Sequence, residues 1–455
     1  MRYDTGVLDR ALRHAREHLN NLESLPAGPS RGLFDIRRQL TKPLTDQGMP
    51  AGQVIDELVA DSAGGVVGCV GGRFHAWVIG GTVPAALAAD WLTSAWDQNA
   101  GIYASGPAAA MTEEVSGGWL KDLLNIPADS SFAFVTGCQM AHATCLAAAR
   151  HRVLANRGWN VEERGLSGAP PIRLIAGSER HGSIVRAVRF LGLGMKNIVE
   201  VPVDEAGGFP PDGLARELAL HPDAPAIVLL QAGDVNTGAY DSFADLIPIA
   251  RRFNAWVHVD GAFGLWAAAS PRFRHLMNGG HLADSWATDG HKWLNVPQDC
   301  GYAFVSDRAA HLGAMSHRES YLIHDGDARD QMDWNPEWSR RARGFATYAA
   351  LRQLGRAGVA EIVERCCDLA RRMVLGIGAL PGAEVVREPI INQGLVRFST
   401  HDTDRVIAAI NESGEAFFGG TTWRGMRCMR VSVSNWITTK EDVDRVVAVV
   451  ARVLT

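Results

Sequence analysis

Six short apolar runs, separated by segments with helical spacing, constrain the fold of this chain more than any other feature. The runs are SFAFVTG (131–137), PIRLIAGS (171–178), PAIVLLQAG (225–233), AWVHVDGAFG (255–264), DSWATDGHKW (284–293) and GYAFVSD (301–307). Apolar residues that follow one another without alternation are typical of strands buried on both faces, as in parallel sheets covered by helices. The sequence therefore predicts an α/β domain with a mainly parallel central sheet and helices on both faces.

The pattern changes after residue 345. Residues 346–380 have helical spacing, and GLVRFST and MRCMRVSVSN alternate like half-exposed antiparallel strands. The last segment, TTKEDVDRVVAVVARVL, reads as a helix that begins at Thr438 or Thr439. We therefore expect a helical, wrapping N-terminal segment over residues 1–60, a large domain over 61–345 and a smaller α+β domain over 346–455.

Composition and charge exclude several classes of function. The 455 residues include 45 basic and 50 acidic side chains, so there is no basic excess for a nucleic acid or an anionic membrane. The seven cysteines are odd in number and include no CxxC, which indicates reduced thiols. The charged N-terminus lacks the apolar core of a secretory signal, and no apolar stretch is long enough to span a membrane. We expect a cytoplasmic protein.

Polar residues recur just past the carboxyl end of each predicted strand. They lie at 136–139, 178–181 and 231–237, at Asp260, and at 291–292. In open α/β sheets, ligands bind in the crevice outside the carboxyl ends of the strands. Five separate segments therefore predict one site at this edge of the sheet.

Asp260 and Lys292 are the charged residues that most suggest chemistry. Taken alone, Asp260 could cap a helix, and Lys292 could be a surface lysine whose stem lies on apolar residues. A lysine between His291 and Trp293 can also have a lowered pKa and act as a nucleophile. With a helix start at 137–142 that can bind an anion, the pair fits pyridoxal 5′-phosphate (PLP). This cofactor needs a lysine for its aldehyde, an acid for its ring nitrogen and donors for its phosphate.

The segments HVDGAFG around Asp260 and DSWATDGHKWLNVPQDCG around Lys292 resemble the PLP-dependent group II amino-acid decarboxylases. That family includes aromatic-L-amino-acid, glutamate and histidine decarboxylases, and the chain is similar to a bacterial-type member from about residue 45 to the end. The resemblance implies PLP fold type I (aspartate aminotransferase-like) and a homodimer with active sites near the subunit interface. The implied reaction converts an L-amino acid to its amine and CO₂.

The resemblance also implies how the cofactor is held. Lys292 would form the Schiff base with PLP, Asp260 would pair with the pyridine nitrogen, and His181, in SERHGS, would stack on the ring. The remaining implied cofactor contacts belong to segments already named: Gly137, Cys138 and Gln139 at the phosphate, Asp289 and His291 nearby, and Ala262 after the aspartate.

Two further residues take roles from the resemblance alone. Tyr321, in ESYLIHDG, matches a loop tyrosine that donates a proton to the carbanionic carbon from the neighbouring subunit. Arg340, in SRRARGF, matches a position that orders this region. The implied catalytic residues are Lys292, His181, Tyr321 and Asp260, with no metal.

Three alternatives stay open. An aminotransferase would keep the substrate carboxylate and bind it with an arginine, for which Arg397 is the only small-domain candidate, although we expect it to face solvent. A decarboxylation-dependent oxidase would use O₂. A protein of another class would bind PLP without turnover, which the joint presence of the implied catalytic residues disfavours.

Departures from the family pattern leave the substrate undetermined. Asp234, Val235 and Asn236 replace a threonine run, Gln139-Met140 replaces small residues at the phosphate, and Gly80-Gly81 stands where a threonine approaches the substrate carboxylate in the aromatic enzymes. The segment from residue 77 to 99, which includes Trp77 and Trp91, is expected to line the substrate pocket. Its mixture of residues matches no single class of amino acid.

Overall fold

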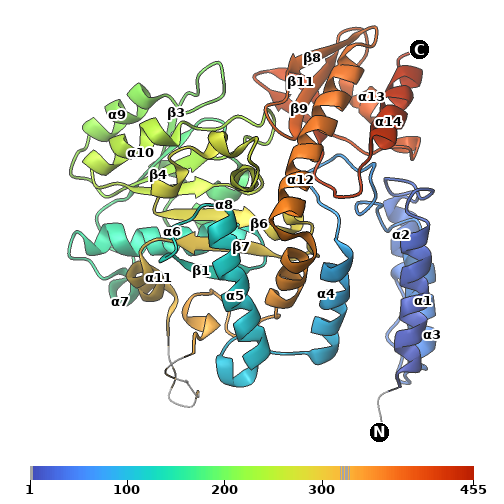
Figure 1. The fold of residues 1–455 in the computed structure, drawn as a ribbon, viewed down its shortest axis with the longest axis horizontal. Helices are drawn as coiled ribbons and strands as arrows, with labels where there is room; N and C mark the ends of the chain where they lie inside the picture. The colour runs from blue at the N-terminus through green and yellow to red at the C-terminus, as the bar shows by residue number, and fades with distance from the viewer. Residues whose placement is uncertain (1–3, 318, 320–321, 323–325, 327) are drawn as a thin grey trace.

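A seven-stranded sheet forms the centre of the molecule (Figure 1). The computed structural model describes residues 4–317, 319, 322, 326 and 328–455. In spatial order the strands are β1 (Ser131–Val135), β7 (Gly301–Val305), β6 (Ser285–Asp289), β5 (Trp256–Asp260), β4 (Ala226–Gln231), β2 (Arg173–Gly177) and β3 (Ile198–Val201). Only β7 runs antiparallel to its neighbours, so the prediction of a mainly parallel sheet is confirmed.

The apolar runs form strands because both faces of the sheet are buried. In β1, Phe132 and Phe134 pack into one core, whereas Ala133 and Val135 pack into another on the opposite face. The second core also takes in α6 (Cys138–Ala155), α8 (Gly182–Phe190) and α11 (Arg308–Met315). The first core lies under α5 (Pro107–Leu123), α9 (Pro211–Ala219), α10 (Phe243–Arg252) and α12 (Gly344–Gly378). Helices therefore cover both faces, as predicted.

The connection between β6 and β7 has a special place in this sheet. The two strands pair as a hairpin, from Asp289 with Gly301 to Ser285 with Val305. Lys292 lies in the connection, so a strand of the sheet fixes the chain on each side of it.

A four-stranded antiparallel sheet lies near the C-terminus. Its order is β10 (Gly419–Trp423), β11 (Met426–Ser432), β9 (Gln393–Phe398) and β8 (Ala383–Arg387). Two of these strands were expected, and β8 and β10 are additional. α13 (Thr403–Glu412) and α14 (Lys440–Val453) pack with this sheet. Thr439 caps α14 in a reciprocal capping box with Asp442, which confirms the expected start.

Three N-terminal helices lie at one side of the molecule, where α1 (Gly6–Asn20) runs beside α3 (Ala51–Ser62) (Figure 1). No residue of α1, α2 (Leu33–Leu40) or α3 is buried. We call residues 4–62 the N-terminal arm. The next helix, α4 (Pro84–Trp96), packs against α12, and α7 (Val161–Arg164) is a single turn. The division of the chain at residues 60 and 345 stays a prediction.

The described residues include no helix that is both long and apolar enough to cross a membrane. All seven cysteines are free thiols, as expected.

Candidate active site

The predicted site residues meet at the carboxyl edge of the large sheet. Asp260 ends β5 and Asp289 ends β6, and the turn at Gly137 joins β1 to α6. The Cys138 backbone N–H donates to Asp289 Oδ1 at 2.5 Å, which ties the start of α6 to the end of β6. The edge expected from the sequence therefore brings these three segments into contact.

Lys292 projects from a single π-helical turn, Gly290–Leu294, directly after β6. Such turns are rare and are common at functional sites. Its Nζ lies 3.0 Å from Asp289 Oδ2. Burial would lower the pKa of the Lys292 ammonium, but Asp289, Cys138 and Asp260 together raise that pKa above its ordinary value, Asp289 through both its charge and its hydrogen bond. In this arrangement Lys292 is a cation paired with Asp289, contrary to the lowered pKa expected from its apolar neighbours.

A glycine pair brings the loop at 77–82 against this lysine. The Gly80 N–H donates to the His291 carbonyl oxygen at 3.4 Å. A Cβ atom at Gly80 would collide with the Lys292 carbonyl oxygen, and one at Gly81 with the Asn435 side chain. Gly80 and Gly81 therefore stand where a larger residue has no space, and the loop borders the site as expected.

Asp260 is buried and anionic. Its Oδ1 accepts the Ala262 N–H at 3.1 Å and lies 3.5 Å from His142 Nε2. Burial would raise the pKa of this carboxyl, but His142, His181 and Lys292 together bring it well below its ordinary value. A buried carboxylate that stays ionised can pair with a cationic ring nitrogen.

The first turn of α6 offers donors to an anion. The helix has 18 residues, and its start presents backbone N–H groups beyond Gly137. Gln139 adds a side-chain donor, because its Nε2 is shielded from solvent and has no hydrogen-bond partner among the described residues. A Cβ atom at Gly137 would lie 3.2 Å from His291 Cε1 and 3.3 Å from Asp289 Oδ1. This crowded, donor-rich turn fits a phosphate group.

His181 caps α8 at the end of β2. Its Nδ1 accepts the Ser183 N–H at 3.2 Å, which fixes the ring orientation. Partial burial lowers the pKa of His181. The charge of Asp260 opposes this lowering, and the charge of Lys292 adds to it. The ring is therefore neutral at pH 7 and lies within the electrostatic reach of both charged site residues.

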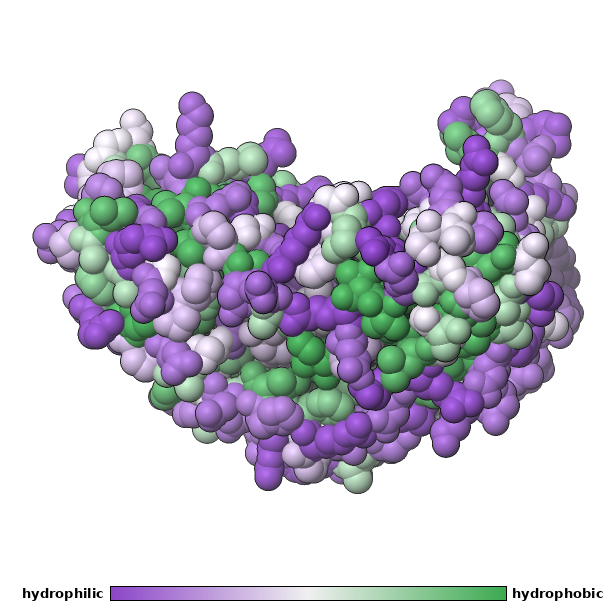
Figure 2. All heavy atoms as spheres, turned by 90° about the horizontal axis from the view of Figure 1, so that it is seen from above, coloured by the Kyte–Doolittle hydropathy of each residue, from purple (hydrophilic) through white to green (hydrophobic). Residues whose placement is uncertain are grey.

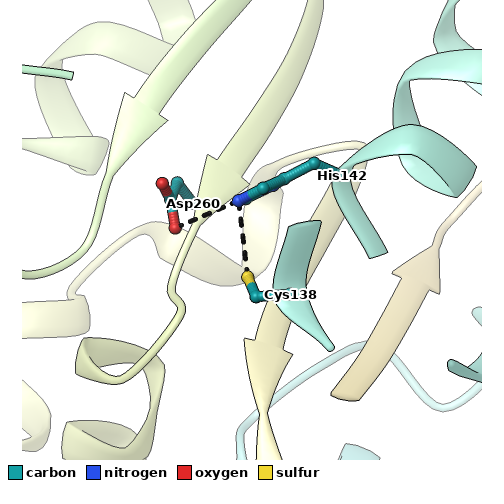
Figure 3. A group of neighbouring side chains, drawn as sticks. All are labelled: Cys138, His142 and Asp260. Atoms are coloured by element: carbon teal, nitrogen blue, oxygen red, sulfur yellow. Dashed lines mark hydrogen bonds and ion pairs between the residues drawn. The ribbon is translucent and has the colours of Figure 1, made fainter. Parts of the chain in front are cut away.

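Cys138, His142 and Asp260 gather behind the site (Figure 3). Their potential ligand atoms all lie within 4.8 Å of one another, a set that could hold a metal ion. Burial, together with the nearby carboxylates, raises the pKa of the Cys138 thiol well above its ordinary value. Cys138 Sγ and Asp260 Oδ1 lie 3.4 and 3.5 Å from His142 Nε2, and we interpret the cluster as a hydrogen-bonded network.

Sequence reasoning missed Arg430, on β11. Its Nε and Nη2 atoms are shielded from solvent and have no hydrogen-bond partner among the described residues. Burial lowers the pKa of this guanidinium, and the charge of Asp234 opposes that lowering. The positive charge of Arg430 in turn lowers the pKa of His181. Asp234 itself accepts hydrogen bonds from Asn236 and Thr237 within its own loop. In the sequence, Arg430 is marked only as an arginine in an alternating strand.

The other arginines behave differently. Arg340 is buried, pairs with Glu113 at 2.6 Å and donates to the Ala100 and Phe134 carbonyl oxygens. These bonds join α5, β1 and the chain before α12. Arg397 pairs with Glu384 at the surface, in line with the expected exposure. Tyr321 lies outside the described residues.

Comparisons with known proteins agree with this geometry. The pyridoxal-dependent decarboxylase conserved domain matches residues 35–401. The chain belongs to the pyridoxal-dependent decarboxylase family. It is an amino-acid decarboxylase that uses PLP, which confirms the predicted family, cofactor and reaction.

Curated relatives and solved structures extend the similarity. The chain is 24% identical to an aromatic-L-amino-acid decarboxylase of Bacillus atrophaeus, covering 94% of this chain and 90% of the relative. It is 24% identical to a 4-hydroxyphenylacetaldehyde synthase of Rhodiola rosea, covering 82% of this chain and 79% of the relative. Oryza sativa TDC, solved with PLP and tryptamine, superposes with a TM-score of 0.92 at 22% identity, covering 100% and 98%. Mouse CSAD superposes with a TM-score of 0.91 at 22% sequence identity, and the match covers 98% of each chain. These structures confirm the predicted fold.

Proposed function

We propose that this decarboxylase carries PLP on Lys292 and removes the α-carboxylate of an L-amino acid. The observation that carries this assignment is the placement of Lys292 and Asp260 at the ends of neighbouring strands, beside the first turn of α6. When bound, PLP accepts the electron pair that remains as CO₂ leaves.

Each remaining site residue then has a role toward the cofactor. Asp260 keeps a proton on the pyridine nitrogen, because a carboxylate favours the charged form of a neighbouring base. His181 would stack on the ring. The start of α6 would hold the phosphate, with the residues Gly137, Cys138, Gln139, Asp289 and His291 around it. Ala262 holds Asp260 through its backbone N–H. Tyr321 delivers a proton to the substrate α-carbon.

Arg430 is our candidate for holding the substrate carboxylate. A shielded guanidinium with free donors binds a carboxylate strongly, because both partners have already lost water. Its charge reaches His181, so it lies beside the proposed cofactor ring. Holding the carboxylate in a fixed orientation positions the bond that breaks.

An aromatic wall lies next to Arg430 and favours an aromatic or large apolar substrate side chain. Trp77 lies 5.7 Å from Phe74 and 5.5 Å from Phe417 between ring centroids, and 57% of its surface is exposed. A Cβ atom at Gly419 would lie 3.6 Å from Trp77 Nε1, and Gly419 pairs with Arg430 across β10 and β11. The aromatic wall and the Arg430 guanidinium thus lie on the same side of the proposed site.

We propose that the enzyme is a cytoplasmic homodimer, with the N-terminal arm packed on the partner. The arm exposes Leu8 at 62%, Leu33 at 62% and Phe34 at 79%. An apolar groove of about 850 Å³ separates α1 from α4. From above, apolar side chains gather near the middle of the visible face, between more polar lobes (Figure 2). Apolar surface of this extent is typical of protein interfaces.

Borohydride trapping tests the lysine assignment. The purified yellow holoenzyme should lose its cofactor absorbance on reduction, and peptide mass mapping should place the added mass on Lys292. Mass on another lysine would overturn the assignment.

A panel of the standard and hydroxylated aromatic L-amino acids, assayed for CO₂, amine and aldehyde, tests the reaction. We expect CO₂ and amine, fastest with aromatic substrates. CO₂ with aldehyde, ammonia and peroxide would identify an oxidase instead. Amino-group transfer without CO₂ would identify an aminotransferase.

A further inference from the structure

Strand β5 presents three polar groups to α6. In the sequence WVHVD, Trp256, His258 and Asp260 alternate with valines, so the three side chains share one face of the sheet. Trp256 packs in the core that contains α6, while Val257 and Val259 pack in the opposite core. His258 and Asp260 therefore approach the same helix, which presents His142.

Hydrogen bonds link these groups into a buried chain. Trp256 Nε1 donates to Ser285 Oγ at 2.9 Å, and Ser285 Oγ lies 2.9 Å from His258 Nδ1. His258 Nε2 lies 2.9 Å from His142 Nδ1, and His142 Nε2 lies 3.5 Å from Asp260 Oδ1. The two imidazole rings and the serine are buried.

The ends of the chain fix its direction. An indole N–H can only donate, and a carboxylate can only accept. Burial lowers the pKa of His258 to about 3, so this ring is neutral and has one N–H. When His142 donates from Nε2 to the carboxylate and accepts at Nδ1 from His258, the protons point from Trp256 through Ser285, His258 and His142 to Asp260.

We propose that His142 and His258 form a directed chain of donors that holds the Asp260 carboxylate in its ionised form and in place against the cofactor ring. His142 is a positioning residue here, since it acts through Asp260. The inference rests on the proposed contact between Asp260 and the pyridine nitrogen. Without the donor, burial would favour protonation of Asp260, and the shared proton would move from the ring nitrogen to the carboxyl.

The chain differs from an ordinary pair of core histidines in where it ends. His311 provides the comparison, because it is also fully buried and bonded to a serine, Ser131, at 2.8 Å. Its other nitrogen lies 2.9 Å from the Trp334 carbonyl oxygen, so that chain ends on the backbone. The chain through His142 ends on the carboxylate of the active site, and Cys138 Sγ lies 3.4 Å from the same Nε2.

The test uses holoenzyme reconstituted with PLP labelled with ¹⁵N at the pyridine nitrogen. The nitrogen chemical shift reports directly whether the ring is protonated. The variants are His142→Leu, which removes the donor, His142→Gln, which restores a side-chain N–H, and His258→Leu, which removes the second link. His311→Gln is the matched control for altering a buried histidine.

We expect the wild-type resonance to be that of a protonated ring. In His142→Leu it should move toward the unprotonated position, and the Kd for PLP should rise by about 10- to 100-fold, as expected for loss of a hydrogen bond to a charged group. His142→Gln should recover most of both effects. His258→Leu should move the resonance in the same direction by less, and His311→Gln should not move it. If His142→Leu does not fold, His258→Leu decides the question.

An unchanged resonance in both leucine variants would overturn the proposal, as would an equal change in His311→Gln. Asp260→Asn separates this failure from that of the underlying assignment. If Asp260→Asn leaves the resonance unchanged, Asp260 does not contact the ring nitrogen. If Asp260→Asn moves it while His142→Leu and His258→Leu do not, the donor chain alone is wrong.

Discussion

At the scale of single residues, the surroundings of three arginines decide what each can do. Arg340 is buried against Glu113 and two carbonyl oxygens, so its guanidinium is already paired within the fold. Arg397 shares an exposed pair with Glu384, an arrangement that stabilises little. Arg430 has two shielded, unpartnered nitrogen atoms and is the one of these three that can receive a substrate carboxylate.

Arg430→Gln should therefore reduce kcat/KM by about 10- to 100-fold, because a charge-assisted hydrogen bond to the substrate is lost. The affinity for PLP should change little. Steady-state kinetics with the best amino acid, and equilibrium dialysis with PLP, measure the two quantities. Arg397→Gln is the control and should stay within about twofold, since surface pairs contribute little. Equal losses in both variants would remove Arg430 from the site.

The sequence predicted where most residues of the proposed site lie in the fold, but it did not predict the residues that contact them. Lys292, Asp260 and Gly137 follow apolar runs, so their place at the strand ends could be predicted. His142 and His258 lie inside a helix and a strand, and only the register of β5 against β6, which sets His258 opposite Ser285, shows what they contact. Arg430 carries no sequence signal, because its importance comes from two shielded nitrogen atoms that have no hydrogen-bond partner among the described residues.

At the scale of elements, edge strands were the hardest to predict. β3 has four residues, and only Val201 is buried, so it lacks the fully apolar run of an inner strand. β10, with the sequence GGTTW, begins with two glycines, which weaken a strand pattern. The reversed direction of β7 could not be predicted, because a strand buried on both faces has the same composition in either direction.

The close contact between the 77–82 loop and the turn that carries Lys292 gives an element-scale prediction. Gly80→Ala would place a methyl group on the Lys292 carbonyl oxygen, so the two elements must separate. We expect a loss of about 1–3 kcal/mol in the free energy of unfolding and weaker PLP retention. Denaturant unfolding and cofactor absorbance after dialysis check this. Gly118→Ala, in a helix with open space around it, is the control and should retain PLP normally.

At the scale of the whole molecule, the N-terminal arm is the least self-sufficient part. Deleting residues 1–45 should abolish the dimer or cause aggregation, because α1 and α2, the helices that this deletion removes, bury no residue within their own subunit. Light scattering of the truncated holoenzyme measures the mass. A soluble, active monomer of the truncated chain would contradict both the dimer and the role of the arm.

Acid should destabilise the fold through three buried histidines. Burial lowers the pKa of His75 to about 4 and those of His258 and His311 to about 3. The unfolded chain binds these protons near pH 6.5 and the folded chain does not, so the stability present above pH 6.5 is lost as pH falls toward 4. Each histidine contributes about 1.4 kcal/mol per pH unit. Unfolding of His311→Gln across this range should show a slope smaller by that amount, and an unchanged slope would refute the assignment.

The hairpin of β6 and β7 has a consequence for the order in which the enzyme is completed. Its pairs are close in sequence, whereas β1 reaches β7 only after nearly the whole domain has been made. Local pairs form early and distant pairs late. A nascent or partly unfolded chain can thus present Lys292 before α6 has come to face it. Stable retention of the cofactor therefore reports that the last long-range pairing of the sheet has closed.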